Sequence, residues 1–117
     1  MSFKFESLRV WQNALEYGEK INNIADGFSR KELFNLCTQV RRAADSIGLN
    51  IAEGPAGLSD LERSRFLTFA NRSALETAAC LIKARRRLYM SESQFNTLYK
   101  ECEQLVKMIQ AFKNKLK

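Results

Sequence analysis

The stretch that decides the fold runs from Gln39 to Gly54 and reads Gln-Val-Arg-Arg-Ala-Ala-Asp-Ser-Ile-Gly-Leu-Asn-Ile-Ala-Glu-Gly. Together with the residues just before it, its apolar side chains recur at spacings of three and four, the period of an amphipathic helix. We therefore expect a helix that packs one apolar face into a core and ends at Gly54. That face carries Leu33, Leu36, Val40, Ala44, Ile47 and Ile51.

A row of polar residues follows one flank of this apolar face. The mid-helix residues Gly48 and Asn50 both lower helix propensity, so tertiary contacts are needed to explain them. Three interpretations of the row stay open: a hydrogen-bonded network between helices, direct contact with a ligand, and simple solvation. We favour the network. At about 100° per residue, the row consists of Gln39, Arg42, Ser46, Asn50 and Glu53.

Three further helices are expected along the chain. The first spans about Glu6 to Asp26, and the third continues to about Tyr89. Short loops between successive helices make neighbours antiparallel, so residues 1–117 are predicted to form one all-α domain, an antiparallel up-down-up-down four-helix bundle. Capping boxes open the second, third and fourth helices, at Ser29 with Glu32, Ser59 with Glu62, and Ser91 with Gln94.

The third and fourth helices differ in pattern. The fourth has one strict seam of threes and fours, typical of a coiled coil: Phe95, Leu98, Cys102, Leu105, Ile109, Phe112 and Leu116. On the third we expect the core face to carry Phe66, Phe69, Ala70, Ser73, Thr77, Cys80, Leu81, Ala84 and Leu88.

The third predicted helix is also apolar on a second side. Such a helix is either central to a large core or part of a subunit interface. In a chain of 117 residues we favour the interface, and with it a homo-oligomer. The interface candidates are Leu67, Leu75, Ala78 and Ile82.

The composition argues against several classes of function. The chain has no histidine, the commonest general base and metal ligand, and no phosphate-binding glycine loop or nucleophile motif. We therefore expect no enzyme, no metal and no cofactor. Convergence of Glu53, Glu62 and Glu76 on a metal stays a minor alternative, because the di-iron pattern of helix bundles needs Glu-x-x-His pairs.

Cysteine usage and hydropathy indicate where the protein works. Cys37, Cys80 and Cys102 form no CxxC pair and cannot all be bridged, which suits a reducing compartment. No apolar run approaches the roughly 20 residues of a membrane span, and the first residues lack the apolar core of a signal peptide. We expect a cytoplasmic protein with no membrane association.

The positive charge is concentrated in the second half of the chain. Residues 1–57 hold seven basic and seven acidic side chains, whereas residues 58–117 hold twelve and six. The third helix thus supplies candidates for contact with nucleic acid, although the arginine triplet also favours the helix dipole. The candidates are Arg65, Arg72, Lys83, Arg85, Arg86 and Arg87.

The sequence resembles the four-helix bundle family of 23S ribosomal RNA intervening-sequence proteins. It is similar as well to the accessory proteins of diversity-generating retroelements. The likeness rests on Phe5-x-x-Leu8-x-Val10-Trp11, on the stretch from Gln39 to Gly54, and on Glu62-x-x-Arg65-Phe66-Leu67 with Ala70, Ser73 and Glu76. The polar signature residues in these motifs are Arg41, Arg42, Ser46, Asn50, Glu53, Glu62, Ser73 and Glu76.

The resemblance implies a closed bundle, a ring-shaped homopentamer and a basic surface that contacts nucleic acid. The retroelement accessory proteins also partner a reverse transcriptase. We therefore expect a non-enzymatic, oligomeric bundle that binds RNA or DNA. The alternative is a scaffold or accessory factor for a protein such as a reverse transcriptase, with the charge serving mainly for solubility.

Overall fold

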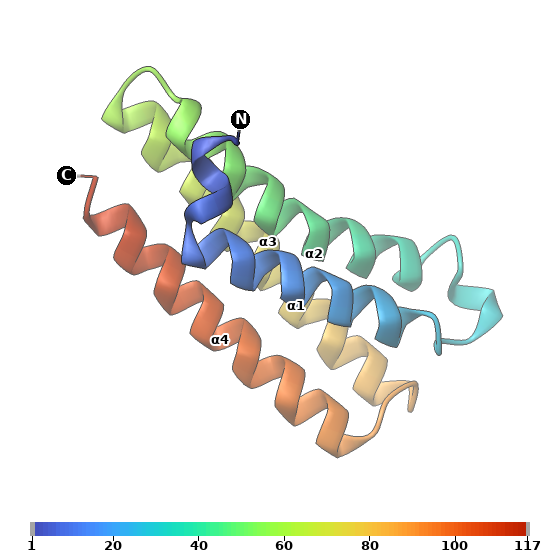
Figure 1. Cartoon of the computed structure of the whole chain (residues 1–117). Coiled ribbons are helices and arrows are strands. Elements are labelled where there is room, and N and C mark those ends of the chain that lie inside the picture. Colours follow the sequence, from blue (N-terminus) through green and yellow to red (C-terminus); the bar gives the residue numbers. More distant parts are fainter. Residues whose placement is uncertain (1, 117) are drawn as a thin grey trace.

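The computed structural model describes residues 2–116 and contains four α-helices in this range: α1 (Arg9–Ala25), α2 (Leu36–Glu53), α3 (Asp60–Arg86) and α4 (Glu92–Asn114). The direction of the chain reverses at each connection, so both termini lie at one end of the molecule (Figure 1). Along the bundle α2 packs against α1 and α3, and α4 packs against α3 and, less extensively, against α1. The predicted up-down-up-down bundle is confirmed.

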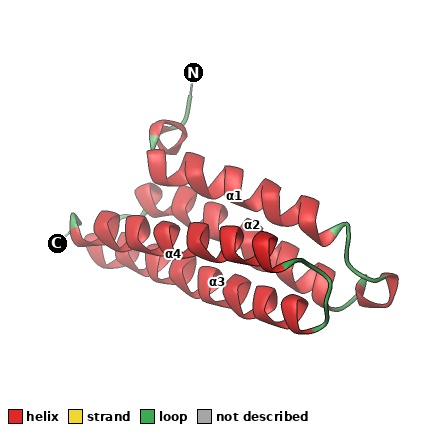
Figure 2. Ribbon diagram, turned by 90° about the horizontal axis from the view of Figure 1, so that it is seen from below, coloured by secondary structure: helices red, strands yellow, loops and turns green. Residues whose placement is uncertain are grey.

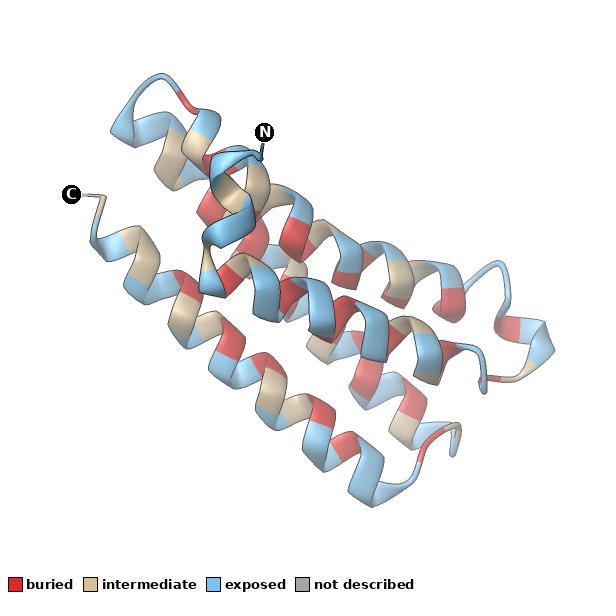
Figure 3. Ribbon diagram, in the orientation of Figure 1, coloured by how far each residue is buried: buried red, intermediate tan, exposed pale blue. Residues whose placement is uncertain are grey.

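The four helices lie side by side along the bundle (Figure 2), and the buried residues of each helix face inward toward the bundle axis (Figure 3). Ile21, Ile47, Leu81 and Ile109, one from each helix, are fully buried. Many core side chains around them are small, which lets the helix backbones approach one another closely. The small buried residues are Ala14, Ala25, Ala43, Ala44, Ala70, Ala74 and Ala84.

Of the three predicted capping boxes, Ser91 with Gln94 is confirmed, and Ser59 with Glu62 forms only the half in which the serine side chain caps the helix. The Ser59 and Ser91 side chains accept hydrogen bonds from the backbone amides of Glu62 and Gln94 at the starts of α3 and α4. Gln94 also accepts from the Ser91 amide, which completes the capping box. The predicted seam of α4 is confirmed as far as Ile109, with Phe95, Leu98, Cys102, Leu105 and Ile109 all buried. Its last two members, Phe112 and Leu116, are only partly buried, and Leu116 follows the end of the helix.

The third predicted cap is wrong, because Ser29 with Glu32 does not open α2. Ser29 precedes a short 3-10 helix, Arg30–Glu32, makes no capping bond, and α2 begins only at Leu36. Leu33 therefore lies outside α2 and is exposed rather than in the core. The first helix also begins later than expected, at Arg9, after a 3-10 helix over Lys4–Ser7.

Glu32 serves a long-range contact instead of a local cap. Its carboxylate is buried and accepts hydrogen bonds from Arg87 at 2.7 Å and from Tyr89 at 3.0 Å. Both partners follow α3, so this cluster ties the connection between α1 and α2 to the connection between α3 and α4. A glutamate paired 55 residues away in sequence cannot be recognised from a local motif.

The end of α3 explains a second difference from the predicted core. The helix ends at Arg86, and Leu88 has a φ of 63°, the left-handed conformation that closes a helix. The backbone of Leu88 therefore turns away from the helix, and its side chain is 88% exposed. Leu88 is not a core residue, contrary to the periodicity.

The Glu32 cluster predicts a specific pH dependence of stability. Burial alone would raise the pKa of Glu32, but the hydrogen bond from Tyr89 and the charge and hydrogen bond of Arg87 together lower it. The contribution to stability is therefore complete above the unfolded pKa of about 4.3 and is lost as the pH falls through the lower folded value. As the pH falls below about 4.5, we expect the free energy of unfolding to decrease less in Glu32→Gln than in the wild type. Urea denaturation at a series of pH values measures both. Parallel stability curves for the two proteins would contradict this prediction.

Candidate nucleic-acid interface

Four cations lie along the outer surface of α3, two in its first half and two near its end. Arg65, Arg72, Lys83 and Arg86 are all exposed, and none forms an ion pair within residues 2–116. At about 100° per residue they fall within about 60° of arc, opposite the side that packs into the core. We call these four residues the basic stripe. The sequence predicted its members, and the structure places them on one face.

The other two arginines of the candidate set are engaged within the bundle. The Arg85 guanidinium lies 3.9 Å from the centroid of the Phe95 ring and 3.9 Å from a carboxylate oxygen of Glu92. Arg87 is held by Glu32. The triplet is thus not a uniform patch: Arg86 belongs to the stripe, whereas Arg85 and Arg87 join α3 to α4 and to the Glu32 cluster. Reversing all three charges would perturb the fold.

The polar signature residues separate into two groups. The first group bridges α2 and α3. The Oγ atoms of Ser46 and Ser73 lie 2.9 Å apart, and Asn50 donates to both the hydroxyl and the backbone carbonyl of Ser46. Nearby, the side-chain amide of Gln39 in α2 donates a hydrogen bond to the Glu76 carboxylate in α3, with 3.5 Å between Nε2 and Oε2. This is the interhelical network expected from the polar flank of α2.

The second group lies outside that network. Arg41 pairs with Asp26 at the end of α1. Arg42, Glu53 and Glu62 are exposed, and their side chains make no hydrogen bond or ion pair with other described residues. Neither the carboxylates nor the thiols gather as a metal site requires: the described part of the chain holds no group of three or more such side chains.

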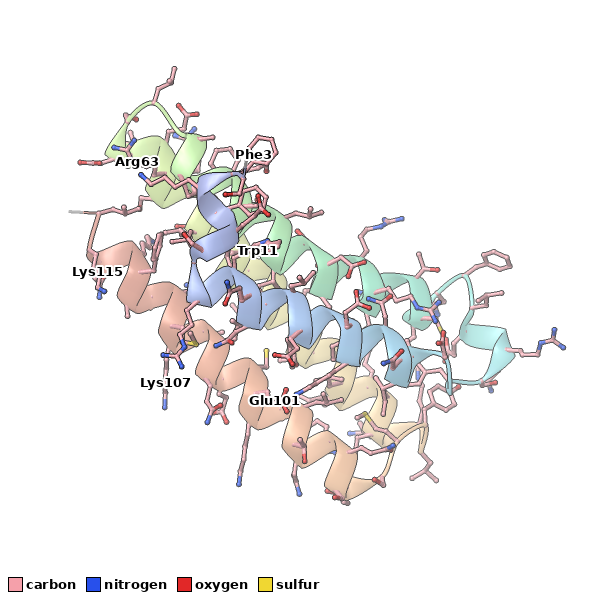
Figure 4. All side chains as sticks on the ribbon, viewed as in Figure 1. Phe3, Trp11, Arg63, Glu101, Lys107 and Lys115 are labelled. Carbon is pink, nitrogen blue, oxygen red and sulfur yellow. The ribbon has the colours of Figure 1, made fainter. Side chains whose placement is uncertain are left out.

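One of the four interface candidates is wrong. Leu67 is fully buried in the core of its own chain, where its side chain lies next to Gly54 in the connection between α2 and α3. Leu75 is 66% exposed and Ile82 is 38% exposed, and Ala78 is half-buried between α3 and α4. Leu75 and Ala78 line a groove of about 250 Å³ along the α3–α4 edge, together with Tyr99, Cys102, Glu103, Val106 and Lys107. Lys107 lies on the outer side of α4 (Figure 4).

A profile described as the 23S rRNA-intervening sequence protein matches residues 6–111. This span covers nearly the whole chain, from the 3-10 helix Lys4–Ser7 to the last turn of α4. The chain belongs to the 23S rRNA-intervening sequence protein family. The family resemblance expected from the sequence is therefore confirmed.

A solved structure supports the fold of this family member. It is a protein of unknown function from the S23 ribosomal protein family of Bacteroides thetaiotaomicron, with a TM-score of 0.83. The two sequences are 24% identical, and the match covers 89% of this chain and 97% of the other. No curated protein matches the chain. At this identity the solved structure shows the shared fold alone.

No helix among residues 2–116 of this family member is long and apolar enough to cross a membrane. Its three cysteines are free and buried in the core, at Cys37, Cys80 and Cys102. Burial raises the pKa of each thiol above its ordinary value. Thiols with raised pKa values are mostly protonated near neutral pH and therefore react slowly.

The bridge between α2 and α3 makes a measurable prediction. We expect Ser73→Ala to lower the free energy of unfolding by about 1 kcal/mol, the usual net worth of a hydrogen bond. The double variant Ser46→Ala/Ser73→Ala should lower the free energy of unfolding by less than the sum of the two single variants, because the two hydroxyls are hydrogen-bonded to each other. Urea denaturation of the four proteins of this cycle gives the coupling energy.

Glu53→Ala is the matched control, since it removes a signature residue that lies outside the network. Its free energy of unfolding should stay within about 0.5 kcal/mol of the wild type. A cost at Glu53 equal to that at Ser73, or strictly additive losses at Ser46 and Ser73, would show that the bridge does not hold α2 to α3.

Proposed function

We propose that this protein is a non-enzymatic, homo-oligomeric bundle that binds the backbone of RNA or DNA through the basic stripe of α3. The observation that carries the proposal is the alignment of four exposed, unpaired cations on one face of a single helix. Cations on any side of the helix would serve solubility or complement the helix dipole, whereas contact with a polyanion calls for cations on one face. The family to which the chain belongs takes its description from an intervening sequence of 23S rRNA.

The dimensions of the stripe suit a nucleic-acid backbone. Arg65 and Arg86 are 21 positions apart on a straight helix, a rise of about 31 Å. Side chains spread over this length can reach several phosphates in succession. Contacts of this kind release counterions and carry little sequence information, so binding should depend steeply on salt and weakly on sequence.

The absence of histidine from the sequence supports the non-enzymatic part of the proposal. The free cysteines support a reducing compartment, and we place the protein in the cytoplasm for this reason.

The exposed apolar edge of α3 supports the oligomer. Leu75 and Ile82 lie beside the basic stripe, on the side toward α4, and with the α3–α4 groove they offer an apolar strip to another copy. Association along this strip would place the stripes of neighbouring subunits close together and multiply their charge. By the family resemblance we propose a pentamer.

A second candidate function is supported by apolar residues at the opposite end of the bundle from the termini. Phe34 is 92% exposed and Leu88 is 88% exposed, and they lie on the two connections that the Glu32 cluster ties together. Exposed apolar residues of this kind suit a protein partner, such as a reverse transcriptase, that the bundle would assist. Recovery of one defined protein after nuclease treatment of a pull-down, lost in a Phe34→Glu variant, would favour this scaffold role.

Charge reversal on the stripe tests the nucleic-acid proposal. Arg65→Glu/Arg72→Glu should weaken binding to RNA or DNA at least tenfold in 100 mM salt and lower the salt slope by about two. The matched control is Arg9→Glu/Lys100→Glu, which gives the same change in net charge at exposed cations away from α3. Fluorescence anisotropy with labelled oligonucleotides measures both, and circular dichroism checks helicity. Equal losses of affinity in the two variants would show that only the net charge matters, and would overturn the assignment of binding to the basic stripe.

The oligomer has its own test. Light scattering coupled to gel filtration should give a multiple of the 13.5 kDa chain for the wild type and a smaller mass for Leu75→Glu. Burial of an exposed apolar side chain in an interface makes a charge at this position costly. Leu49→Glu, on the exposed side of α2, is the matched control and should keep the wild-type mass. A monomeric wild type would end the oligomer proposal.

A further inference from the structure

We propose that Phe69 stacks on a base, and that the ligand of the basic stripe is therefore single-stranded nucleic acid rather than a duplex. This inference rests on the proposed function and adds the class of nucleic acid to it. It comes from a residue that the sequence pattern assigned to the core and that the structure places at the surface.

The position of Phe69 is the first observation. The ring is 40% exposed on α3, although the periodicity predicts a core residue. The core-facing side of α3 is occupied by other residues, among them Ala70, the next residue along the helix, which has no exposed area. Phe69 therefore contributes only part of its ring to packing and leaves the rest at the surface.

The ring is also held in place. Its centroid lies 6.5 Å from that of Phe66, at an interplanar angle of 83°, which is an edge-to-face contact. Phe66 is itself half-buried against the bundle. A stacking surface that is already fixed loses little entropy when a ligand binds, which favours the contact.

The surroundings of the ring are the second observation. Phe69 lines a shallow hollow of about 330 Å³ with Leu61, Ser64, Arg65, Thr68 and Arg72. Two members of the basic stripe thus stand one turn before and one turn after the ring, at i−4 and i+3. An aromatic surface beside unpaired guanidinium groups matches a nucleotide, in which a flat base is joined to a charged phosphate.

Duplex and single-stranded nucleic acid differ in which of their groups can reach this hollow. In a duplex the faces of the bases are covered by their neighbours, so only the phosphates reach a convex helix surface. In a single strand each base can turn outward and stack on an aromatic side chain. The arginines alone would serve both forms, whereas the exposed ring adds affinity only for the single strand.

A second copy of the chain is the competing occupant of this surface. The charge argues against it, because Arg65 and Arg72 would be brought into a contact between identical subunits without an ion-pair partner in their own chain. The apolar strip of Leu75 and Ile82 lies on the other side of the stripe and offers a contact free of this cost.

The test compares a fluorescein-labelled single-stranded 20-mer RNA of mixed sequence with a duplex of the same sequence. Phe69→Leu should weaken single-strand binding about tenfold, as expected for the loss of one stacked base, and should leave duplex binding within about twofold. Phe34→Leu makes the same substitution at an exposed phenylalanine outside the stripe, and it should leave both affinities unchanged. Circular dichroism confirms that each variant is folded.

A spectroscopic readout tests stacking directly. In Phe69→Trp the added indole should be quenched by the single strand and not by the duplex, whereas in Phe34→Trp neither should quench the added indole. The wild-type protein, which keeps Trp11, supplies the background signal.

Each outcome decides the inference. Unchanged or equally reduced affinities for the two RNAs in Phe69→Leu would overturn it, while the proposed function would stand if Arg65→Glu/Arg72→Glu still weakens binding. A wild type that binds neither RNA would overturn both. A smaller assembly mass in Phe69→Leu would make Phe69 a subunit contact and would also overturn the inference.

Discussion

The close approach of α2 and α3 is the constraint on which the rest of the structure depends. At the seam between them the Oγ atoms of Ser46 and Ser73 lie 2.9 Å apart. Two serine side chains can bond directly across a helix interface only when the backbones are close. This seam therefore fixes both the separation of the helices and the rotation of α3 about its own axis.

The rotation of α3 decides which of its residues meet solvent. Once Ser73 faces α2 and Leu67 and Ala74 face the core, the residues on the opposite side must be exposed, and these are the four cations of the basic stripe. The same rotation turns Leu75 and Ile82 toward the α4 edge and Phe69 toward the α2 edge. The proposed site for nucleic acid and the proposed strip for self-association would thus both follow from one packing contact.

The sequence predicted those features that depend on a simple period and on local caps. The seam of α4 and the caps at Ser59 and Ser91 are of this kind, because each is decided within a few residues. The sequence could not decide the α3 faces, since a helix apolar on several sides allows more than one rotation. Leu67 and Phe69, two positions apart and both apolar, consequently exchanged their expected places. Glu32 was misassigned for another reason: its partners Arg87 and Tyr89 are distant in sequence, and no local pattern reveals them.

The three adjacent arginines at the end of α3 have different roles, so their charges do not act as one patch. Arg85 and Arg87 are adjacent to Arg86 in sequence, yet each points to a different neighbour at about 100° per residue. Arg85 covers the Phe95 ring and Arg87 satisfies a buried carboxylate, so both charges stabilise the end of the bundle. Arg86 alone shares a face with Arg65, Arg72 and Lys83. In the proposed function a polyanion would therefore contact a stripe along α3 rather than a cluster at its end. Because the stripe lies beside an apolar edge, it would continue from one subunit into the next in the proposed oligomer.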